Sequence, residues 1–265
     1  MDIRLLGALE ATEGGRSLLP TAGKPRQVFG LLAVHPRQLV PVSALIEELW
    51  GDGPPRSAQS TLQTYILQLR KLLGAALPDG VEEAKRVLTT RYGGYLLDVV
   101  PETVDACAFD LRAACGRQAL EAGDWARAAQ DLSRALELWR GRALADVPIG
   151  RRLAVEVTRL EQFRLSVLEG RIEADLALGR HQSLLSELAA LTARHPLHER
   201  LCAQYMLALY RSGQQWRALE AFAALRRVLV DELGVEPSPR LRELQRGVLN
   251  CAAELDDTYS RPLVA

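Results

Sequence analysis

The residues from Arg56 to Gly74 combine side chains that can recognise nucleic acid with a complete absence of acids. No Asp or Glu occurs between Gly53 and Pro78, although the whole chain has 33 acidic and 33 basic residues. Hydroxyl, amide and basic side chains bind phosphate oxygens and the edges of bases, whereas a carboxylate would be repelled by the phosphates. The chemistry that this composition favours is binding to a polyanion.

The periodicity of the same residues predicts a helix from Ser57 to Leu73 with two distinct faces. At about 100° per residue, four apolar side chains fall together and are expected to be core: Leu62, Ile66, Leu69 and Leu73. Solvated helix faces usually mix acids and bases, so the acid-free opposite face favours DNA reading over simple solvation. Taken by itself, the helix leaves both interpretations open.

Leu67 is an apolar residue on the outward face of this helix. Two roles fit it: contact with the methyl group of a thymine, or packing under a neighbouring hairpin. That hairpin is predicted in TTRYGGYLL, where Arg91 and Tyr92 precede two glycines at the tip. A basic residue on a narrow turn can enter a minor groove or bind a phosphate.

Lys24 and Arg26 stand at the start of an earlier helix and are candidate phosphate contacts, for which ordinary surface charge is an equal alternative. The full set of candidate DNA-binding residues is Lys24, Arg26, Arg56, Ser60, Thr61, Gln63, Thr64, Leu67, Gln68, Arg70, Lys71, Arg91 and Tyr92.

The elements around these residues follow the order sheet, helix, helix, longer helix, hairpin. DIRLLGALEAT and SLLPTA flank the turn signal EGGR, and a helix begins near Pro25. A short helix with Ser43 as its N-cap ends near Gly51, and RVLTTRYGGYLLDV closes the half as a second hairpin. This order predicts an α+β winged helix-turn-helix over residues 1–98.

Residues 99–250 show apolar residues at helical spacing, interrupted by glycines, and this pattern predicts an all-α domain. Gly123, Gly179 and Gly213 each stand between two helices with apolar periodicity, and the last two lie 34 residues apart, the tetratricopeptide period. Residues 142–162 break strict repetition. Stacked helical hairpins favour a concave surface for protein contact, and an inert helical bundle is the alternative. The fold class is therefore mainly α, a winged helix followed by a tetratricopeptide-like domain.

The composition excludes several classes of function. A net charge of zero excludes binding through bulk positive charge, although not through a local basic face. No apolar run is long enough to span a membrane, and the first residues do not resemble a signal peptide. Scattered cysteines with no C-x-x-C are expected to be reduced. We therefore expect a cytoplasmic protein that does not contact a membrane, and the candidate DNA-reading helix makes association with the nucleoid the further expectation.

Nothing in the sequence favours an enzyme. The pair His195 and His198 lacks a third ligand, so no metal site is expected, and no nucleophile elbow or glycine-rich nucleotide loop occurs. No cofactor is expected either. Residues 251–265 are predicted to form a flexible tail. The principal alternative to a DNA-binding function is that of a tetratricopeptide-type adaptor, which binds other proteins and has no promoter-specific DNA binding.

Several motifs along the chain are specific when taken together. In the first half they are GKPRQVFGLLAVHP, SALIEELWGDGPPRSAQSTLQTYILQLRKLLG and TTRYGGYLL. In the second half they include VDACAFD, ALELWRGRALADV, RLEQFRLSVLEGRIEADLALGRH and HPLHERLCAQYMLALYRSGQQWRALEAF. Over about Ile3 to Asn250, the chain with these motifs resembles the Streptomyces antibiotic regulatory proteins. The resemblance implies an OmpR-type winged helix followed by a bacterial transcriptional activation domain.

The same resemblance implies a function and partners. It implies a transcription activator of a secondary-metabolite gene cluster that binds direct repeats near promoters as a homodimer on double-stranded DNA. RNA polymerase with its principal sigma factor is the implied protein partner. Relatives have a small residue where this chain has Leu67 and an arginine where it has Gln68, so a different operator sequence is expected. By the same resemblance, Ser57–Leu73 is the recognition helix and the hairpin tip Arg91–Tyr95 is the wing. Relatives usually have the sequence Arg-Pro-Pro-Gly-Tyr at the wing, whereas this chain has Arg-Tyr-Gly-Gly-Tyr.

Overall fold

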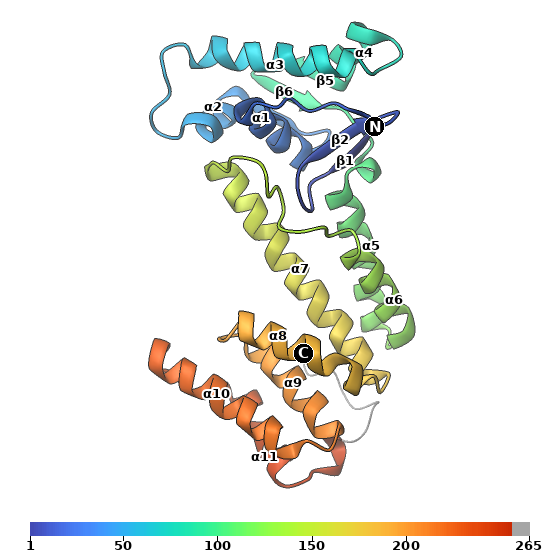
Figure 1. Cartoon of the computed structure of the whole chain (residues 1–265), viewed down its shortest axis with the longest axis vertical. Coiled ribbons are helices and arrows are strands. Elements are labelled where there is room, and N and C mark those ends of the chain that lie inside the picture. Colours follow the sequence, from blue (N-terminus) through green and yellow to red (C-terminus); the bar gives the residue numbers. More distant parts are fainter. Residues whose placement is uncertain (256–265) are drawn as a thin grey trace. The chain divides into compact units, whose positions relative to one another are not determined.

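The computed structural model describes residues 1–255, which form two compact units that we describe separately (Figure 1). The first unit joins residues 1–113 to residues 134–165, and the second joins residues 114–133 to the chain from Ser166 onward. The first unit thus holds the predicted winged helix together with a segment from the other half of the chain. Of the predicted tail, residues 256–265 lie outside the described residues.

The chain begins with a small antiparallel sheet in the order β1-β2-β3, formed by Asp2–Arg4, Glu10–Glu13 and Arg16–Ser17. Ile3 pairs with Ala11, and Glu13 pairs with Arg16 across Gly14 and Gly15. Both glycines have positive φ, which a tight hairpin turn requires and other residues rarely adopt. The predicted hairpin at EGGR is confirmed, and β1 extends it to three strands.

The winged helix follows, and Figure 1 shows its helices around a second sheet. Its helices are α1 (Gly23–Val34), α2 (Val42–Trp50), α3 (Ala58–Gly74) and α4 (Gly80–Val87). Its strands are β4 (Leu39–Pro41), β5 (Leu88–Arg91) and β6 (Gly94–Leu97), in the order β4-β6-β5. The predicted order of elements is confirmed, with β4 and α4 as additions.

The start of α2 differs from the expectation. Ser43 lies inside the first turn, because the helix begins at Val42 and its N-cap position is Pro41. No side chain caps this end. The predicted end is correct, since Gly51 follows the helix with φ of 59° and donates its N–H to the carbonyl of Glu47.

The remaining elements are helical. They are η1 (Pro101–Thr103), α5 (Asp105–Glu121), α6 (Trp125–Leu136), α7 (Arg151–Ala177), α8 (His181–Arg194), α9 (Glu199–Arg211), α10 (Gln215–Leu233), α11 (Pro239–Leu249) and η2 (Ala253–Leu255). Gly123, Gly179 and Gly213 turn the chain between successive helices with φ of 74°, 74° and 72°. The interpretation of these glycines as hairpin loops is confirmed. The fold is mainly α, as predicted.

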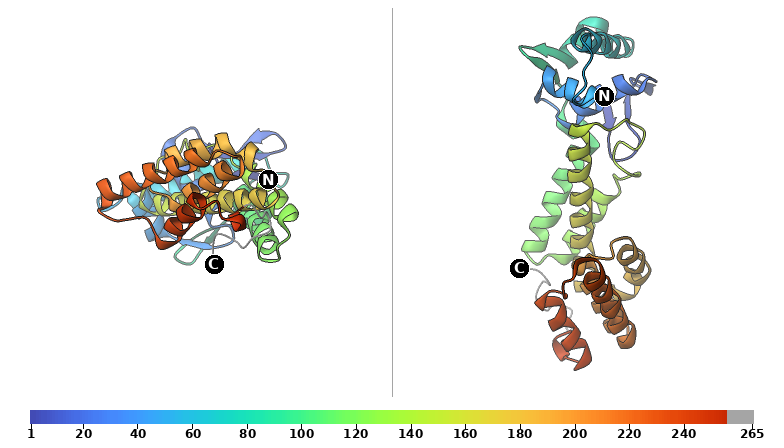
Figure 2. Two further views of the ribbon diagram at one scale, coloured as in Figure 1. Left: turned by 90° about the horizontal axis from the view of Figure 1, so that it is seen from below. Right: turned by 90° about the vertical axis from the view of Figure 1, so that its left-hand side faces the viewer.

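In the second unit α8, α9 and α10 pack side by side, as both Figure 1 and Figure 2 show. Their core includes Met206, Leu209, Ala218 and Phe222, all buried. Small residues allow close packing elsewhere in this unit, since a Cβ on Gly116 would lie 2.5 Å from the side chain of Leu132. Among the described residues, no helix combines the length and the apolar composition that crossing a bilayer requires.

Candidate nucleic-acid interface

One face of α3 is buried in the core, and its burial holds the opposite, polar face toward solvent. Leu62, Ile66, Leu69 and Leu73 are each at most 2% exposed, as the periodicity predicted. Burying each of these side chains contributes roughly 1.5–3 kcal/mol, so the helix cannot rotate about its axis without a large loss of stability. The opposite face is consequently held toward solvent. Its exposed residues are Arg56, Ser60, Gln63, Thr64, Leu67, Gln68 and Lys71.

The polar residues of this face differ in how much hydrogen-bonding capacity remains for a ligand. The hydroxyls of Ser60 and Thr64 donate to the carbonyls of Ser57 and Ser60, at 2.9 and 3.0 Å, and keep only their acceptor capacity. The side-chain amides of Gln63 and Gln68 make no hydrogen bond within residues 1–255. Thr61 is half-buried at the edge of the face. The two glutamines therefore offer the most complete donor and acceptor pairs.

The hairpin of β5 and β6, which is the predicted wing, ends in a narrow tip. Arg91 pairs with Gly94, so Tyr92 and Gly93 form a two-residue turn, and Arg91 and Tyr92 are exposed. Gly93 has φ of 79°, which suits glycine. Gly94 is required for space, because a Cβ there would lie 2.3 Å from the carbonyl oxygen of Val40.

Arg70 connects the hairpin to α3. Its Nε and Nη2 donate to the carbonyl oxygen of Leu88 at 2.9 and 2.7 Å, and Nη2 also donates to Oγ1 of Thr90 at 2.8 Å. The guanidinium is thus engaged by β5 and only partly exposed. Arg70 thus holds β5 to α3, and this positioning of the wing is a role that the sequence did not predict for it.

Replacing Arg70 with alanine is expected to lower the free energy of unfolding by roughly 1.5–3 kcal/mol, the range for hydrogen bonds to a charged group. The wing then loses its fixed position, so DNA affinity falls while the preferred sequence stays the same. Urea titrations and gel shifts measure the two effects. Lys71→Ala is the matched control for stability, since its exposed side chain makes no ion pair in the described chain. Equal stability of the two variants would contradict this assignment.

The two basic residues of α1 also differ from each other. Arg26 forms an ion pair with Asp146 and donates from Nη2 to the carbonyl of Leu9 at 3.1 Å. Because these intramolecular contacts engage its guanidinium, Arg26 is less available to a phosphate than Lys24. The ammonium of Lys24 lies 4.9 Å from the ring centroid of Trp50 and is exposed, so it stays available to a phosphate.

Sequence reasoning missed a group that supports this interface from behind. Glu48 of α2 is 2% exposed, and its carboxylate accepts hydrogen bonds from the backbone N–H groups of Gly150, Arg152 and Leu153 at 2.7–3.0 Å. Gln27 of α1 donates to both the carbonyl and the carboxylate of Glu48 at 2.8 Å. The carboxylate of the winged helix thus caps the first turn of α7.

Two further carboxylates bind backbone of the N-terminal segment. Asp105 accepts from the N–H groups of Leu5 and Leu6 at 2.6 and 3.0 Å, and Asp146 accepts from Leu9 at 2.7 Å. Burial raises the pKa of the Asp105 carboxyl, and the two N–H donors partly offset that effect. No sequence signal identified these contacts, because their partners lie about 100 residues or more apart.

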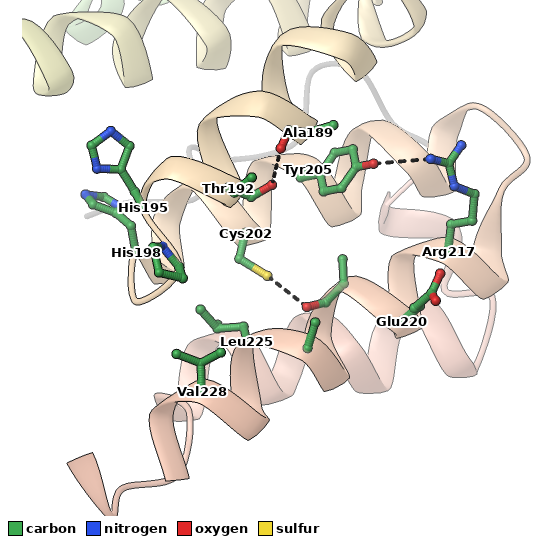
Figure 3. Close-up of a pocket in the computed structure, with 14 residues that line it drawn as sticks. Ala189, Thr192, His195, His198, Cys202, Tyr205, Arg217, Glu220, Leu225 and Val228 are labelled. Atoms are coloured by element: carbon green, nitrogen blue, oxygen red, sulfur yellow. Dashed lines mark hydrogen bonds between the residues drawn. The ribbon is translucent and has the colours of Figure 1, made fainter. Parts of the chain in front are cut away.

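A cleft of about 360 Å³ lies between α8, α9 and α10 of the second unit (Figure 3). Its lining includes His195, His198 and Cys202, and Nε2 of His198 lies 3.0 Å from a carboxylate oxygen of Glu169. Burial raises the pKa of the Cys202 thiol to about 12, so this sulfur is not a nucleophile at neutral pH. Residues 1–255 contain no cluster of three side chains suited to a metal.

Comparison with known proteins gives matches over both halves of the chain. Residues 17–97 match the family "Transcriptional regulatory protein, C terminal", and residues 104–249 match the family "Bacterial transcriptional activator domain". Regulatory protein DnrI of Streptomyces peucetius is 54% identical over 97% of this chain and 94% of its own length. Transcriptional regulator RedD of Streptomyces coelicolor is 36% identical over 94% of this chain and 70% of its own.

A solved structure is also similar. It is Mycobacterium tuberculosis EmbR in complex with a low affinity phosphopeptide, with a TM-score of 0.88 and 33% identity. The match covers 97% of this chain and 68% of that one. The similarity therefore extends across the winged helix and the helical domain.

Proposed function

This chain belongs to the Streptomyces antibiotic regulatory proteins, a family of transcriptional activators, and from that premise we propose which DNA it binds and how. It binds promoter DNA sequence-specifically and activates a secondary-metabolite gene cluster. The observation that carries the proposal is the acid-free, exposed face of α3, to which Arg70 joins strand β5 of a wing with an exposed tip. The fixed orientation of that face supports entry of α3 into the major groove.

Within this proposal the contacts divide into two kinds. Gln63, Thr64 and Gln68 read base edges. The two glutamine amides do so through bidentate contacts, each good one contributing roughly 1–3 kcal/mol of discrimination, and the Thr64 hydroxyl does so as an acceptor. Arg56, Lys71, Lys24 and Arg91 bind phosphates and supply salt-dependent affinity, and Ser60, Thr61 and Tyr92 complete the surface. Residues 1–98 have 11 basic and 10 acidic residues, so the attraction is local to this surface.

Pairing and polymerase contact complete the proposed mechanism. A single winged helix buries a small interface on DNA, and two copies on a direct repeat raise the effective affinity through linked binding. A direct repeat requires head-to-tail packing of the two copies, without two-fold symmetry. The helical domain contacts RNA polymerase and its principal sigma factor, and the protein acts in the cytoplasm at the nucleoid.

Two substitutions test the division of contacts. Gln68→Ala is expected to lose preference for the specific site over random duplex, because the amide that reads a base is removed. Lys71→Ala is expected to weaken both kinds of binding alike and to lower the slope of log affinity against log salt by about one. Gel-shift titrations at several salt concentrations measure both. If neither variant changes binding, α3 is not the reading helix.

The rival function is an adaptor that acts through the helical repeats alone. Its support is the concave cleft of the second unit, which is suited to a protein contact. It differs from the proposed function in one measurable respect. An adaptor shows no salt-sensitive preference for DNA upstream of its own or neighbouring genes, whereas the proposed activator does.

A further inference from the structure

Leu67 is an apolar side chain on the face of α3 that carries the proposed base-reading residues. It is 68% exposed, whereas the apolar residues of the opposite face are at most 2% exposed. The hairpin is joined to α3 through Arg70, whose guanidinium binds the carbonyl of Leu88. Packing beneath the hairpin, one of the two roles expected from the sequence, does not agree with this exposure.

The surroundings of Leu67 are polar on every side that faces solvent. Gln63, Thr64 and Lys71 lie three or four positions away and share its face, and Gln68 is adjacent in sequence; all four are exposed. An isolated leucine among polar groups is too small an apolar surface to dock a protein partner. A ligand complementary to this face must therefore be polar in general and apolar at one point.

The major groove of DNA has that character. Its base edges carry hydrogen-bond donors and acceptors, and the C5-methyl group of thymine is its distinctive apolar feature. We infer that Leu67 contacts the methyl group of a thymine and selects a T·A pair at that position. The inference rests on the proposed function, because it requires α3 to lie in the major groove.

The neighbouring glutamines extend the inference to the sequence around that thymine. A glutamine amide pairs in bidentate fashion with N6 and N7 of adenine. With Gln63 and Gln68 flanking Leu67, the centre of the recognised sequence combines adenine with thymine. An arginine at position 68 would instead favour guanine, so Leu67 and Gln68 together turn the preference toward A·T pairs.

The experiment removes only the methyl group. A duplex that the full chain enriches from a random pool is resynthesised with deoxyuridine in place of each thymine in turn. At the thymine that Leu67 contacts, the substitution is expected to weaken binding of the unmodified protein about threefold to fivefold, the effect of one buried methyl group. Leu67→Ala is expected to bind the thymine and uracil duplexes equally. Gln63→Ala is the matched control: it is expected to weaken binding to both duplexes and to keep the ratio between their affinities.

The outcomes separate the inference from the proposed function. The inference is overturned if Leu67→Ala keeps the full ratio of affinities for the thymine and uracil duplexes. It is also overturned if the unmodified protein binds every uracil duplex as tightly as the thymine duplex. A Leu67→Ala variant that keeps the ratio but loses activation of transcription assigns the leucine to a protein contact, which also overturns it. Failure of the unmodified protein to enrich any sequence overturns the proposed function itself. Because Leu67 is exposed, the variant is expected to melt at the temperature of the unmodified protein.

Discussion

Replacing Glu48 with alanine is expected to lower the free energy of unfolding by roughly 2–5 kcal/mol. The change leaves the N–H groups of Gly150, Arg152 and Leu153 without their acceptor, and each buried unpaired donor costs about 1–3 kcal/mol. It also removes a negative charge from the positive end of the α7 dipole. Urea titration of the full chain, followed by circular dichroism, measures the loss.

Glu47→Ala is the matched control for this prediction. The carboxylate of Glu47 lies 2.7 Å from the guanidinium of Arg152, but both side chains are substantially exposed. Exposed ion pairs contribute about 0–1 kcal/mol. The two adjacent glutamates of one helix should therefore differ by several-fold in effect. Equal losses for the two variants would show that Glu48 does not hold α7 to the winged helix.

Residues 1–98 expressed alone are expected not to fold at temperatures at which the full chain is folded. Leu5, Leu6 and Leu9 are buried, and their backbone N–H groups bind Asp105 and Asp146, which the fragment lacks. The carbonyls of Leu5 and Leu6 likewise accept from the N–H groups of residues 144 and 140. The fragment would expose these apolar side chains and leave the backbone groups unpaired.

Thermal melting by circular dichroism and dispersion of amide signals by NMR measure this effect. The control fragment is residues 1–177, which keeps the partners of Glu48, Asp105 and Asp146 and the whole of α7. It is expected to melt cooperatively. A fragment 1–98 that melts cooperatively, at the temperature of the control, would contradict the conclusion that the winged helix depends on residues 105–153.

Local patterns were sufficient to predict much of the fold and the direction of the candidate site. The apolar period of α3 identified its buried face, because burial on one side requires regular spacing. Loop glycines identified the helical hairpins, because their positive φ leaves few alternatives to glycine. By contrast, α4 has only eight residues, of which Ala84 alone is buried, and the three residues of β4 are too few to show a period.

Side-chain partners distant in sequence could not be predicted. In the sequence, Arg26, Arg70 and Lys71 are equivalent cations. Only their neighbours in the fold show which of them is bound within the protein and which is exposed to solvent. Arg26 binds Asp146 and Arg70 binds the backbone of β5, whereas Lys71 extends from the surface. Glu48 likewise reads as an ordinary acid of an amphipathic helix. Its hydrogen bonds reach residues more than 100 positions away, and no local pattern encodes such a pairing.

The sequence specificity of the whole protein is tested most directly by selection of duplexes from a random pool at fixed salt. The full chain is expected to enrich a short DNA sequence that contains A·T pairs and occurs as a direct repeat. Its affinity for that repeat should fall steeply as salt rises. Because α3 is proposed to recognise this sequence, Gln68→Ala should enrich a sequence that is less strictly conserved among the selected duplexes. Recovery of a pool as diverse as the starting one, by the folded full chain, would contradict the proposal that this protein recognises DNA by sequence.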